Sequence, residues 1–221
     1  MEIINRSTIS NQVLEYFRDK IMNQELRPNE RIIETRVAKE LGVSQGSVRE
    51  AIQKLDAMGL VKVKPYSGTF VRPFDEKRLK DAYELRNLLE GFSAPYACEN
   101  ISEQAIERMK QLRSEMDIYA ARNDRRSLVK CDVEFHREII LAADNSILEK
   151  MWDIACVPQW TGYTIMLHDD VYYFPKSHDN ILSYLVQRDS QNLISELNNH
   201  FDNAKTIAVK NWIKHEKTNN K

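Results

Sequence analysis

The apolar positions near the start of the chain follow the spacing of an amphipathic helix. Val13, Phe17 and Ile21 recur every four residues and give residues 10–24 one apolar face. Pro28 follows soon after this face ends, and proline biases the residue before it away from helical backbone angles. The pattern therefore predicts one helix that ends before Pro28.

Two more short helices are predicted directly downstream. The first is expected over residues 35–41, with Thr35 as its N-cap and Gly42 where a helix commonly ends in a left-handed residue. Ser44 is expected to cap the next helix, which Gly59 ends. The inner face of that helix is formed by Val48, Ile52 and Leu55.

A β-hairpin is predicted after the third helix. Residues 60–64 (LVKVK) alternate as a strand does, residues 65–68 (PYSG) have the composition of a turn, and residues 69–71 (TFV) continue as a second strand. Three helices followed by a hairpin form a winged helix-turn-helix, which we predict over residues 1–73.

From residue 75 onward the chain shows helical spacing and no strand pattern. Helical stretches are expected roughly over 75–99, 102–122, 125–143, 146–167, 176–188 and 190–214. Pro158 is expected to kink or split the fourth stretch, and residues 168–175 form the longest expected loop. Short polar connectors are typical of antiparallel neighbours. We therefore predict a mainly α protein whose second domain, residues 74–221, is an all-α antiparallel helical bundle.

Composition and charge narrow the class of protein. The chain of 221 residues holds only 6 glycines and 6 prolines, which favours long helices. Residues 1–74 carry 12 Lys and Arg against 9 Asp and Glu, while the remainder carries 20 against 24. This asymmetry indicates that the front domain meets a polyanion. Without a long apolar run or a signal-peptide core, the protein is expected to be cytoplasmic, with no membrane partner.

The helix-turn-helix carries the polar side chains expected of a DNA-binding surface. The N-terminus of the third helix can enter a major groove, where backbone amides suit phosphate and Gln or Arg can bond base edges. The candidate DNA-binding residues are Arg36, Ser44, Gln45, Ser47, Arg49, Lys64 and Gly68. Ordinary helix capping and solvated charges are the alternative. The attached hairpin and its local basic charge favour double-stranded DNA as the partner.

Four polar residues are expected to point into the core of the bundle. Asp132 and His136 lie one helical turn apart on an apolar face, and His178 and His200 lie on apolar faces of two later helices. Buried polar groups need partners, and one divalent ion supplies a partner for all four. Zinc is the first choice of ion, with nickel or manganese as alternatives. A lone core histidine is more often hydrogen-bonded than metallated, so that alternative stays open.

Several stretches of the first domain resemble the winged helix-turn-helix of GntR-family repressors. They are residues 37–44 (VAKELGVS), 48–55 (VREAIQKL) and 59–61 (GLV). The second domain resembles the FadR-type ligand-binding domain, FCD, so that the resemblance covers about residues 7–213. The metal pattern of that family is Asp-x-x-x-His followed by two separate histidines. In this chain it falls on Asp132, His136, His178 and His200.

Two departures from the family pattern concern the DNA-binding surface. Gln45 and Ser47 stand where the family usually has Arg and Pro, and Tyr66 and Ser67 precede Gly68 where its wing usually has a Gly-Arg-Gly turn. These departures affect the operator sequence rather than DNA binding itself. A homodimer is expected, because two-fold symmetry matches one recognition helix to each half of a palindromic operator.

The resemblance also implies a binding site for a small organic acid. Arg86 matches the arginine of the family's Glu-Leu-Arg-x-x-Leu-Glu motif, which tends to face the ligand cavity in relatives. A guanidinium opposite a bound cation suits a small carboxylate. A salt bridge between Arg86 and Glu90 is the alternative. Asn145 is a second candidate for the effector site, with helix capping as its alternative.

These observations predict a transcriptional regulator, most simply a repressor, whose operator binding responds to a small carboxylate at or near a divalent metal. A metal-responsive regulator with no organic effector is the main alternative. A metalloenzyme is the weaker one. The chain has no nucleophile elbow, Gly-rich phosphate loop or second carboxylate pair to support catalysis. We therefore expect no enzymatic activity.

Overall fold

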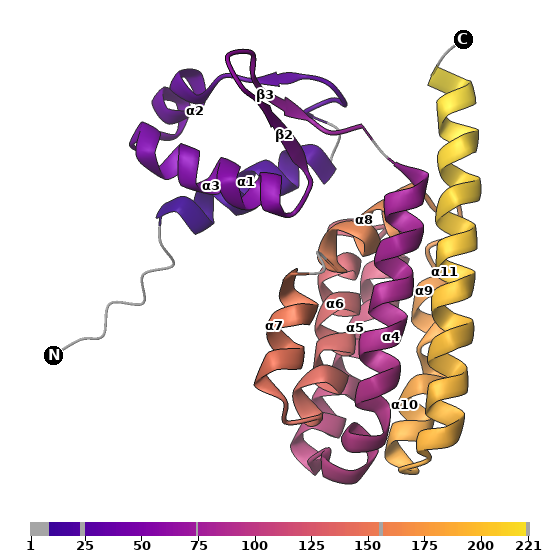
Figure 1. Cartoon of the computed structure of the whole chain (residues 1–221). Helices are drawn as coiled ribbons and strands as arrows, with labels where there is room; N and C mark the ends of the chain where they lie inside the picture. The colour runs from indigo at the N-terminus through magenta and orange to yellow at the C-terminus, as the bar shows by residue number, and fades with distance from the viewer. Residues whose placement is uncertain (1–8, 23–24, 74, 155–156, 220–221) are drawn as a thin grey trace, which may run out of the picture. The chain divides into compact units, whose positions relative to one another are not determined.

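The computed structural model describes residues 9–22, 25–73, 75–154 and 157–219 (Figure 1). The chain divides into two compact units, Met1–Asp75 and Glu76–Lys221. The first combines helices with a small sheet, and every helix or strand in the described part of the second is a helix. The mainly α fold predicted from the sequence is confirmed.

The first unit is a winged helix-turn-helix. Its elements are α1 (Ile9–Met22), β1 (Arg31–Ile32), α2 (Glu34–Leu41), α3 (Gln45–Ala57), β2 (Val61–Lys64) and β3 (Gly68–Val71). The three strands form an antiparallel sheet in the order β1-β3-β2. The three helices and the hairpin follow the prediction, and β1 is an addition. Two residues are too few to show an alternating pattern, so β1 left no signal in the sequence.

Local chemistry explains most helix boundaries in the first unit. Gly42 ends α2 in the left-handed region at φ 65°, and the Ser44 side chain caps α3 by accepting a bond from the Ser47 amide at 3.1 Å. The expected cap at Thr35 is wrong. The helix begins one residue earlier with Ile33 at the N-cap, because the Val37 amide already bonds the Ile33 carbonyl.

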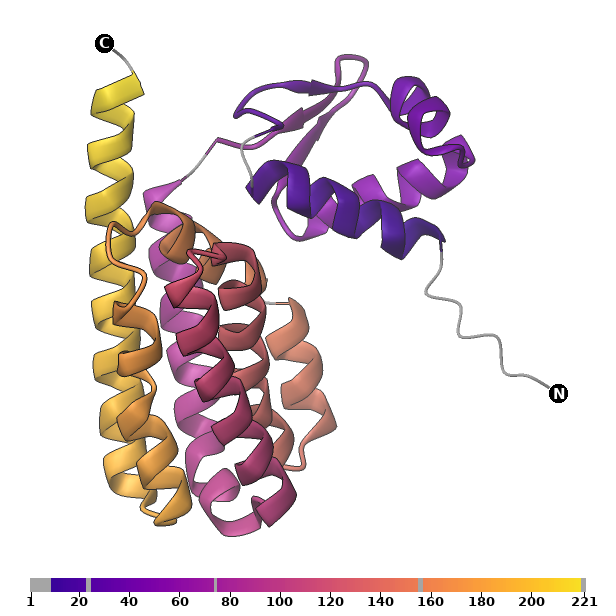
Figure 2. The same cartoon turned by 180° about the vertical axis from the view of Figure 1, so that it is seen from behind.

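The second unit is an antiparallel helical bundle (Figure 2). Its helices are α4 (Glu76–Asn100), α5 (Glu103–Ala121), α6 (Arg125–Ala142), α7 (Ser146–Ile154), α8 (Val157–Leu167), α9 (Tyr173–Ser177), α10 (Asp179–Val186) and α11 (Ser190–Asn219). Both views show α4 running beside α11, and α4 also packs against α6. The helix α4 therefore lies where its inward side chains reach both neighbours.

Two further boundaries in the second unit can be compared with the expectation. The stretch predicted over 146–167 is split into two helices, as Pro158 led us to expect, and Pro158 lies in the first turn of α8, where proline lacks only an amide that has no helical partner. The expected loop over 168–175 is partly wrong, because α9 starts at Tyr173. His178 ends α9 and begins α10, so its side chain is fixed by two short helices.

Candidate metal centre and DNA interface

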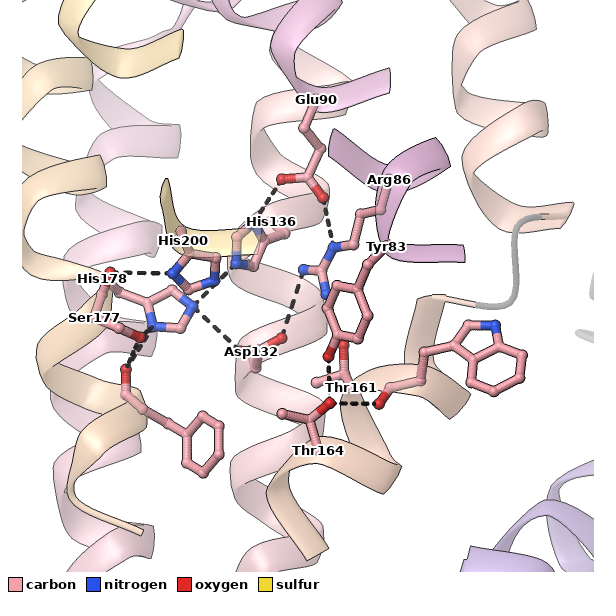
Figure 3. Close-up of polar contacts among 12 residues, drawn as sticks. Tyr83, Arg86, Glu90, Asp132, His136, Thr161, Thr164, Ser177, His178 and His200 are labelled. Atoms are coloured by element: carbon pink, nitrogen blue, oxygen red, sulfur yellow. Dashed lines mark hydrogen bonds and ion pairs between the residues drawn. The ribbon is translucent and has the colours of Figure 1, made fainter. Parts of the chain in front are cut away.

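The structure brings all four predicted metal ligands into one buried cluster (Figure 3). Asp132 and His136 come from α6, His178 from the junction of α9 and α10, and His200 from α11. One potential ligand atom from each residue lies within 4.8 Å of the others. Asp132, His136 and His178 are at most 4% exposed, and His200 is 8% exposed. Helices distant in the sequence therefore converge on one point in the core.

Each imidazole has its Nδ1 atom engaged by an acceptor. His136 Nδ1 lies 2.6 Å from a Glu90 carboxylate oxygen, His178 Nδ1 lies 2.7 Å from the Phe174 carbonyl, and His200 Nδ1 lies 3.3 Å from the Ser177 carbonyl. Carbonyl and carboxylate oxygens only accept hydrogen bonds, so each Nδ1 carries the proton. The Nε2 atoms then present lone pairs. This arrangement is typical of histidines that bind a metal.

Three acceptor atoms meet around one point in this cluster. His178 Nε2 lies 3.1 Å from His136 Nε2 and 3.3 Å from an Asp132 carboxylate oxygen. Atoms bound about 2.1 Å from one ion lie roughly 3 to 3.5 Å from each other. The second oxygen of Asp132 is buried without a hydrogen-bond partner. These atoms therefore fit as ligands of a divalent cation. The cation would remove the repulsion between the facing lone pairs and would give the Asp132 carboxylate a partner.

The pKa shifts favour the protonation states that a metal requires. Burial lowers the pKa of His136, with a further contribution from Arg86, and burial with the neighbouring imidazoles lowers the pKa of His200 far more. Burial alone would raise the pKa of Asp132, but His178 and Arg86 lower it well below its usual range. Neutral imidazoles beside an ionised carboxylate are the forms that coordinate metal ions.

Glu90 connects the histidine cluster to Arg86. Both residues lie on α4, and Arg86 Nε donates to Glu90 at 2.7 Å while the other Glu90 oxygen holds His136. Burial opposes ionisation of Glu90, but the interactions of its carboxylate with His136 and Arg86 outweigh burial and lower its pKa. Sequence analysis treated Glu90 only as a salt-bridge partner. The available signal was its position one turn after Arg86, on the same core-facing side of the helix.

Arg86 has one donor nitrogen without a hydrogen-bond acceptor. Its Nη1 donates to the Thr161 hydroxyl at 2.7 Å, and the guanidinium lies 4.8 Å from the centre of the Phe201 ring. The buried Nη2 has no hydrogen-bond partner and lies 3.6 Å from the free oxygen of Asp132. The salt bridge to Glu90 that sequence analysis left open is present. It occupies only part of the guanidinium.

A small cavity lies beside Arg86 and the cluster. It is lined by Tyr83, Arg86, Asp132, Thr161, Thr164, Ile165, Tyr173, Phe174, Ser177, His200 and Ala204. Its volume of about 10 Å³ accommodates roughly one water molecule. An organic acid therefore requires the lining helices to separate.

Asn145 lies away from this cavity. It is exposed at the start of α7, where its side-chain oxygen accepts bonds from the Ile147 and Leu148 amides, both at 3.1 Å. It is not among the residues that line the cavity beside Arg86. The structure thus gives Asn145 the capping role that sequence analysis had left as its alternative, because the turn before α7 needs an acceptor for its first amides.

The candidate DNA-binding residues lie on the surface of the first unit. Arg36, Ser44, Gln45, Arg49 and Lys64 are exposed, and Ser47 and Gly68 are partly buried. Arg49 bonds Glu34 of α2 at 2.8 Å, so its guanidinium is held over the helix-turn-helix. Lys64 lies over the Phe70 ring, at 4.9 Å from its centre. Gly68 has φ 110°, and a Cβ atom there would lie 2.9 Å from Arg31 Nε. The backbone angle therefore favours glycine at that position.

Comparison with known proteins identifies both units. The family described as "Bacterial regulatory proteins, gntR family" matches residues 9–71, and the "FCD domain" matches residues 81–203. The fold resembles that of E. coli McbR/YncC, with a TM-score of 0.78, 19% identity and coverage of 93% of this chain and 99% of that one. Among the described residues, no helix is long and apolar enough to cross a membrane.

Two curated relatives carry names of the same kind. The chain is 33% identical over 150 residues, 68% of its length, to the "Probable D-xylose utilization operon transcriptional repressor" of Paenarthrobacter nicotinovorans. It is 32% identical over 124 residues, 56% of its length, to the "Nta operon transcriptional regulator" of Aminobacter aminovorans. The chain spans 66% and 59% of these proteins' own lengths. Both are named as regulators, which agrees with the prediction of a regulator and not an enzyme. The chain belongs to the GntR family of bacterial transcriptional regulators, with an FCD domain as its second unit.

Proposed function

We propose that this protein is a transcriptional repressor that binds a palindromic operator as a homodimer and responds to a small carboxylate metabolite. The metabolite binds at or near a divalent ion held by Asp132, His136, His178 and His200. One observation carries the proposal: buried acceptor atoms surround one point, and an Arg86 nitrogen without a hydrogen-bond partner lies beside them. The names of the relatives support control of an operon.

A divalent ion held by these four residues would supply positive charge beside Arg86. Zinc suits three imidazoles and a carboxylate, but four protein ligands complete its tetrahedral site. Nickel or manganese in octahedral geometry keeps two further positions. Glu90 and the Phe174 and Ser177 carbonyls hold the imidazoles in the orientation that binding needs.

Arg86 supplies the second contact for the metabolite. Its Nη2 atom already lies 3.6 Å from the Asp132 carboxylate, so an incoming carboxylate would meet a donor that lacks an acceptor. Thr161 and Thr164 of α8 line the same cavity. Because the cavity holds only about one water, binding must separate helices that line it, among them α4 and α8. This movement gives the metabolite differential affinity for two arrangements of the unit, as allosteric control requires.

DNA binding is assigned to the N-terminus of α3 and to the wing. Ser44 caps the helix, and the exposed side chains of Gln45 and Arg49 are available to base edges. Arg36 lies on α2, Ser47 follows in the first turn of α3, and Lys64 and Gly68 belong to the wing. Phosphate contacts should make the affinity fall steeply with salt.

A surface on α4 and α7 supports the homodimer. Among the side chains that the structure describes, six large apolar ones are exposed there: Leu85, Leu88, Phe92, Tyr96, Ile147 and Met151. With about 200 Å² for one fully exposed large side chain, they present roughly 600 Å² of apolar surface, against roughly 800 Å² per partner in a standard interface. The opposite face of α4 carries Arg86 and Glu90, so one helix connects the pairing surface to the metabolite site.

The test begins with the metal content of native full-length protein. One divalent ion per chain is expected, and chelation should lower the melting temperature because the ion binds only the folded state. Organic acids are then titrated calorimetrically into metal-loaded protein, stripped protein and Arg86→Gln, with Arg137→Gln as the matched control. Binding only to loaded wild type and the control supports the proposal.

Two outcomes would change the assignment. Metal-dependent operator binding with no organic ligand would favour the metal-responsive regulator. Equal acid affinity in loaded, stripped and Arg86→Gln protein would contradict a metabolite site that joins the ion to Arg86.

A further inference from the structure

Tyr66 occupies an unusual backbone position at the tip of the wing. It lies in the turn between β2 and β3 with φ 60°, in the left-handed region that favours glycine. Its side chain is fully exposed, at 109% of the reference value. The strain is therefore not compensated by packing of the ring.

Among the described residues, the other non-glycine residues in the left-handed region have local explanations. Three of the four remaining non-glycine cases are Asn29, Asn123 and Asp144, types that tolerate this region. The fourth, Arg188, donates to three backbone carbonyls through its guanidinium. Tyr66 has neither the right residue type nor a fixed side chain. The turn closed by the Ser67 amide and the Lys64 carbonyl at 3.1 Å accounts for the backbone angle of Tyr66, but it does not require tyrosine. An exposed aromatic residue at this position is explained by an external contact.

The surroundings of Tyr66 suit a polyanion. Lys62 and Lys64 of β2 are exposed, and Arg31 lies against Gly68 on the other side of the turn. Residues 57–74 contain no Asp or Glu. The wing thus presents the ring and hydroxyl of Tyr66 among positively charged side chains. It also follows closely in sequence after α3, the helix assigned to the major groove.

We propose that Tyr66 enters the minor groove of the operator and gives a preference for A·T pairs at the position it reaches. This inference rests on the proposed DNA binding. In the minor groove A·T pairs present only acceptors, to which the phenol can donate, whereas G·C pairs add the guanine amino group, a donor that obstructs it. The cations around the turn favour the negative potential of a narrow A·T groove. This chain has tyrosine at a position where the family's wing usually has glycine.

Substitutions of Tyr66 should therefore change DNA recognition without lowering the stability of the protein. Tyr66→Gly and Tyr66→Asn remove the ring and relieve the left-handed backbone, so the melting temperature should not fall. The same variants should lose the A·T preference. Tyr66→Phe keeps the ring and removes the donor, and it should retain part of the affinity. Asn29→Gly, a second left-handed residue of the same unit, is the matched control for backbone flexibility.

The experiment starts with full-length wild type and a library of random-sequence duplexes. Selection should give a palindromic site with A·T pairs outside the major-groove contacts. Replacing one such pair by G·C should weaken wild-type binding about 5- to 20-fold. An inosine·cytosine pair, which has the minor groove of A·T but the major groove of G·C, should restore it. For Tyr66→Gly all three duplexes should bind within twofold of each other.

The outcomes separate this inference from the proposed function. Tyr66→Gly with unchanged affinity and unchanged A·T preference overturns the role of Tyr66 and leaves DNA binding intact. Failure of inosine·cytosine to restore binding also overturns it, because the preference would then be read in the major groove. A wild type that selects no duplex overturns the proposed function itself.

Discussion

The two units place similar ion pairs in opposite surroundings. In the first unit Arg49 bonds Glu34 at 2.8 Å, and 66% of the Arg49 side chain is exposed. In the second unit Arg86 bonds Glu90 at 2.7 Å, and neither side chain exceeds 4% exposure. The two distances are similar, but the energies of the two ion pairs differ. Water screens the exposed pair, whereas each charge of the buried pair depends on the other for compensation. An exposed arginine is accessible to a large partner from outside, whereas a buried one is accessible only to groups inside the unit.

Removing the acidic residue of each ion pair should give the largest difference in stability between the two units. Glu90→Ala leaves Arg86 buried without its counter-ion and His136 without its acceptor, so we expect a loss of about 3–5 kcal/mol in the free energy of unfolding. Glu90→Gln should lose less, because its amide oxygen still accepts one bond. Glu34→Ala should cost less than about 1 kcal/mol. Urea unfolding of the full chain measures all three, and equal losses for the two alanine variants would contradict the comparison.

The pairing surface of α4 offers the next largest effect. Leu88, exposed at 67%, is the most exposed of the α4 apolar residues, and Leu88→Asp places a charge at the proposed dimer contact. We expect a monomer by sedimentation velocity and operator binding weaker by about 100-fold, since each half-site then binds alone. Ile118→Asp, on α5, is the matched control and should stay dimeric. A dimeric Leu88→Asp protein would place the interface elsewhere.

Arg49→Ala tests the exposed member of the comparison. If the guanidinium reads a base edge, its removal should weaken specific binding about 5- to 150-fold while changing stability by less than about 0.5 kcal/mol. Arg18→Ala removes a partly buried arginine that pairs with Glu15 on α1 of the same unit, and this variant should bind as wild type does. Specific affinity within twofold of wild type for Arg49→Ala would remove this residue from the recognition surface.

The first unit was predictable because its signals are local. Gly42 and Ser44 define their helix boundaries through their own backbone angle and side chain, and the structure shows both. The role of Thr35 was predicted wrongly because a threonine in the first turn of a helix cannot be distinguished by sequence from a threonine at the N-cap. The strand β1 was missed because its pairing with β3 involves residues about forty positions away, Arg31 with Phe70.

The cluster in the second unit was predictable only in part. Helical spacing placed Asp132 and His136 on one inward face, and both are buried. The convergence of His178 and His200 on that face depends on tertiary packing, and the family pattern supplied it. Glu90 was overlooked because its roles toward His136 and Trp152 depend on contacts with α6 and α7. The small size of the cavity has no signature in the sequence.

Acid should lower the stability of the second unit more than that of the first. All five histidines lie in the second unit, and the pKa values of His136 and His200 are lowered in the folded state. The unfolded chain, with a histidine pKa of about 6.5, then binds more protons. The stabilisation is therefore present above about pH 6.5 and is lost as the pH falls. Metal release acts in the same direction.

Hydrogen exchange of the full chain at pH 7 and pH 5, corrected for intrinsic rates, measures this effect. The opening free energies of α6 and α11 should fall, while those of α1 and α3 should change little. A matching fall in the first unit would indicate a general effect of acid rather than one centred on the histidine cluster.

The smallest expected effect concerns the ion pair that holds Arg49. Glu34 keeps the guanidinium at 2.8 Å and adds a negative charge beside the surface assigned to DNA. Glu34→Gln should raise operator affinity about threefold, because exposed pairs contribute only about 0.2–1 kcal/mol. The gain should disappear when Arg49→Ala is combined with Glu34→Gln, since the two residues then no longer interact. Fluorescence anisotropy with a labelled operator at two salt concentrations measures this cycle. An equal gain in both backgrounds would mean that Glu34 repels phosphate directly, and that Arg49 is not held back by its partner.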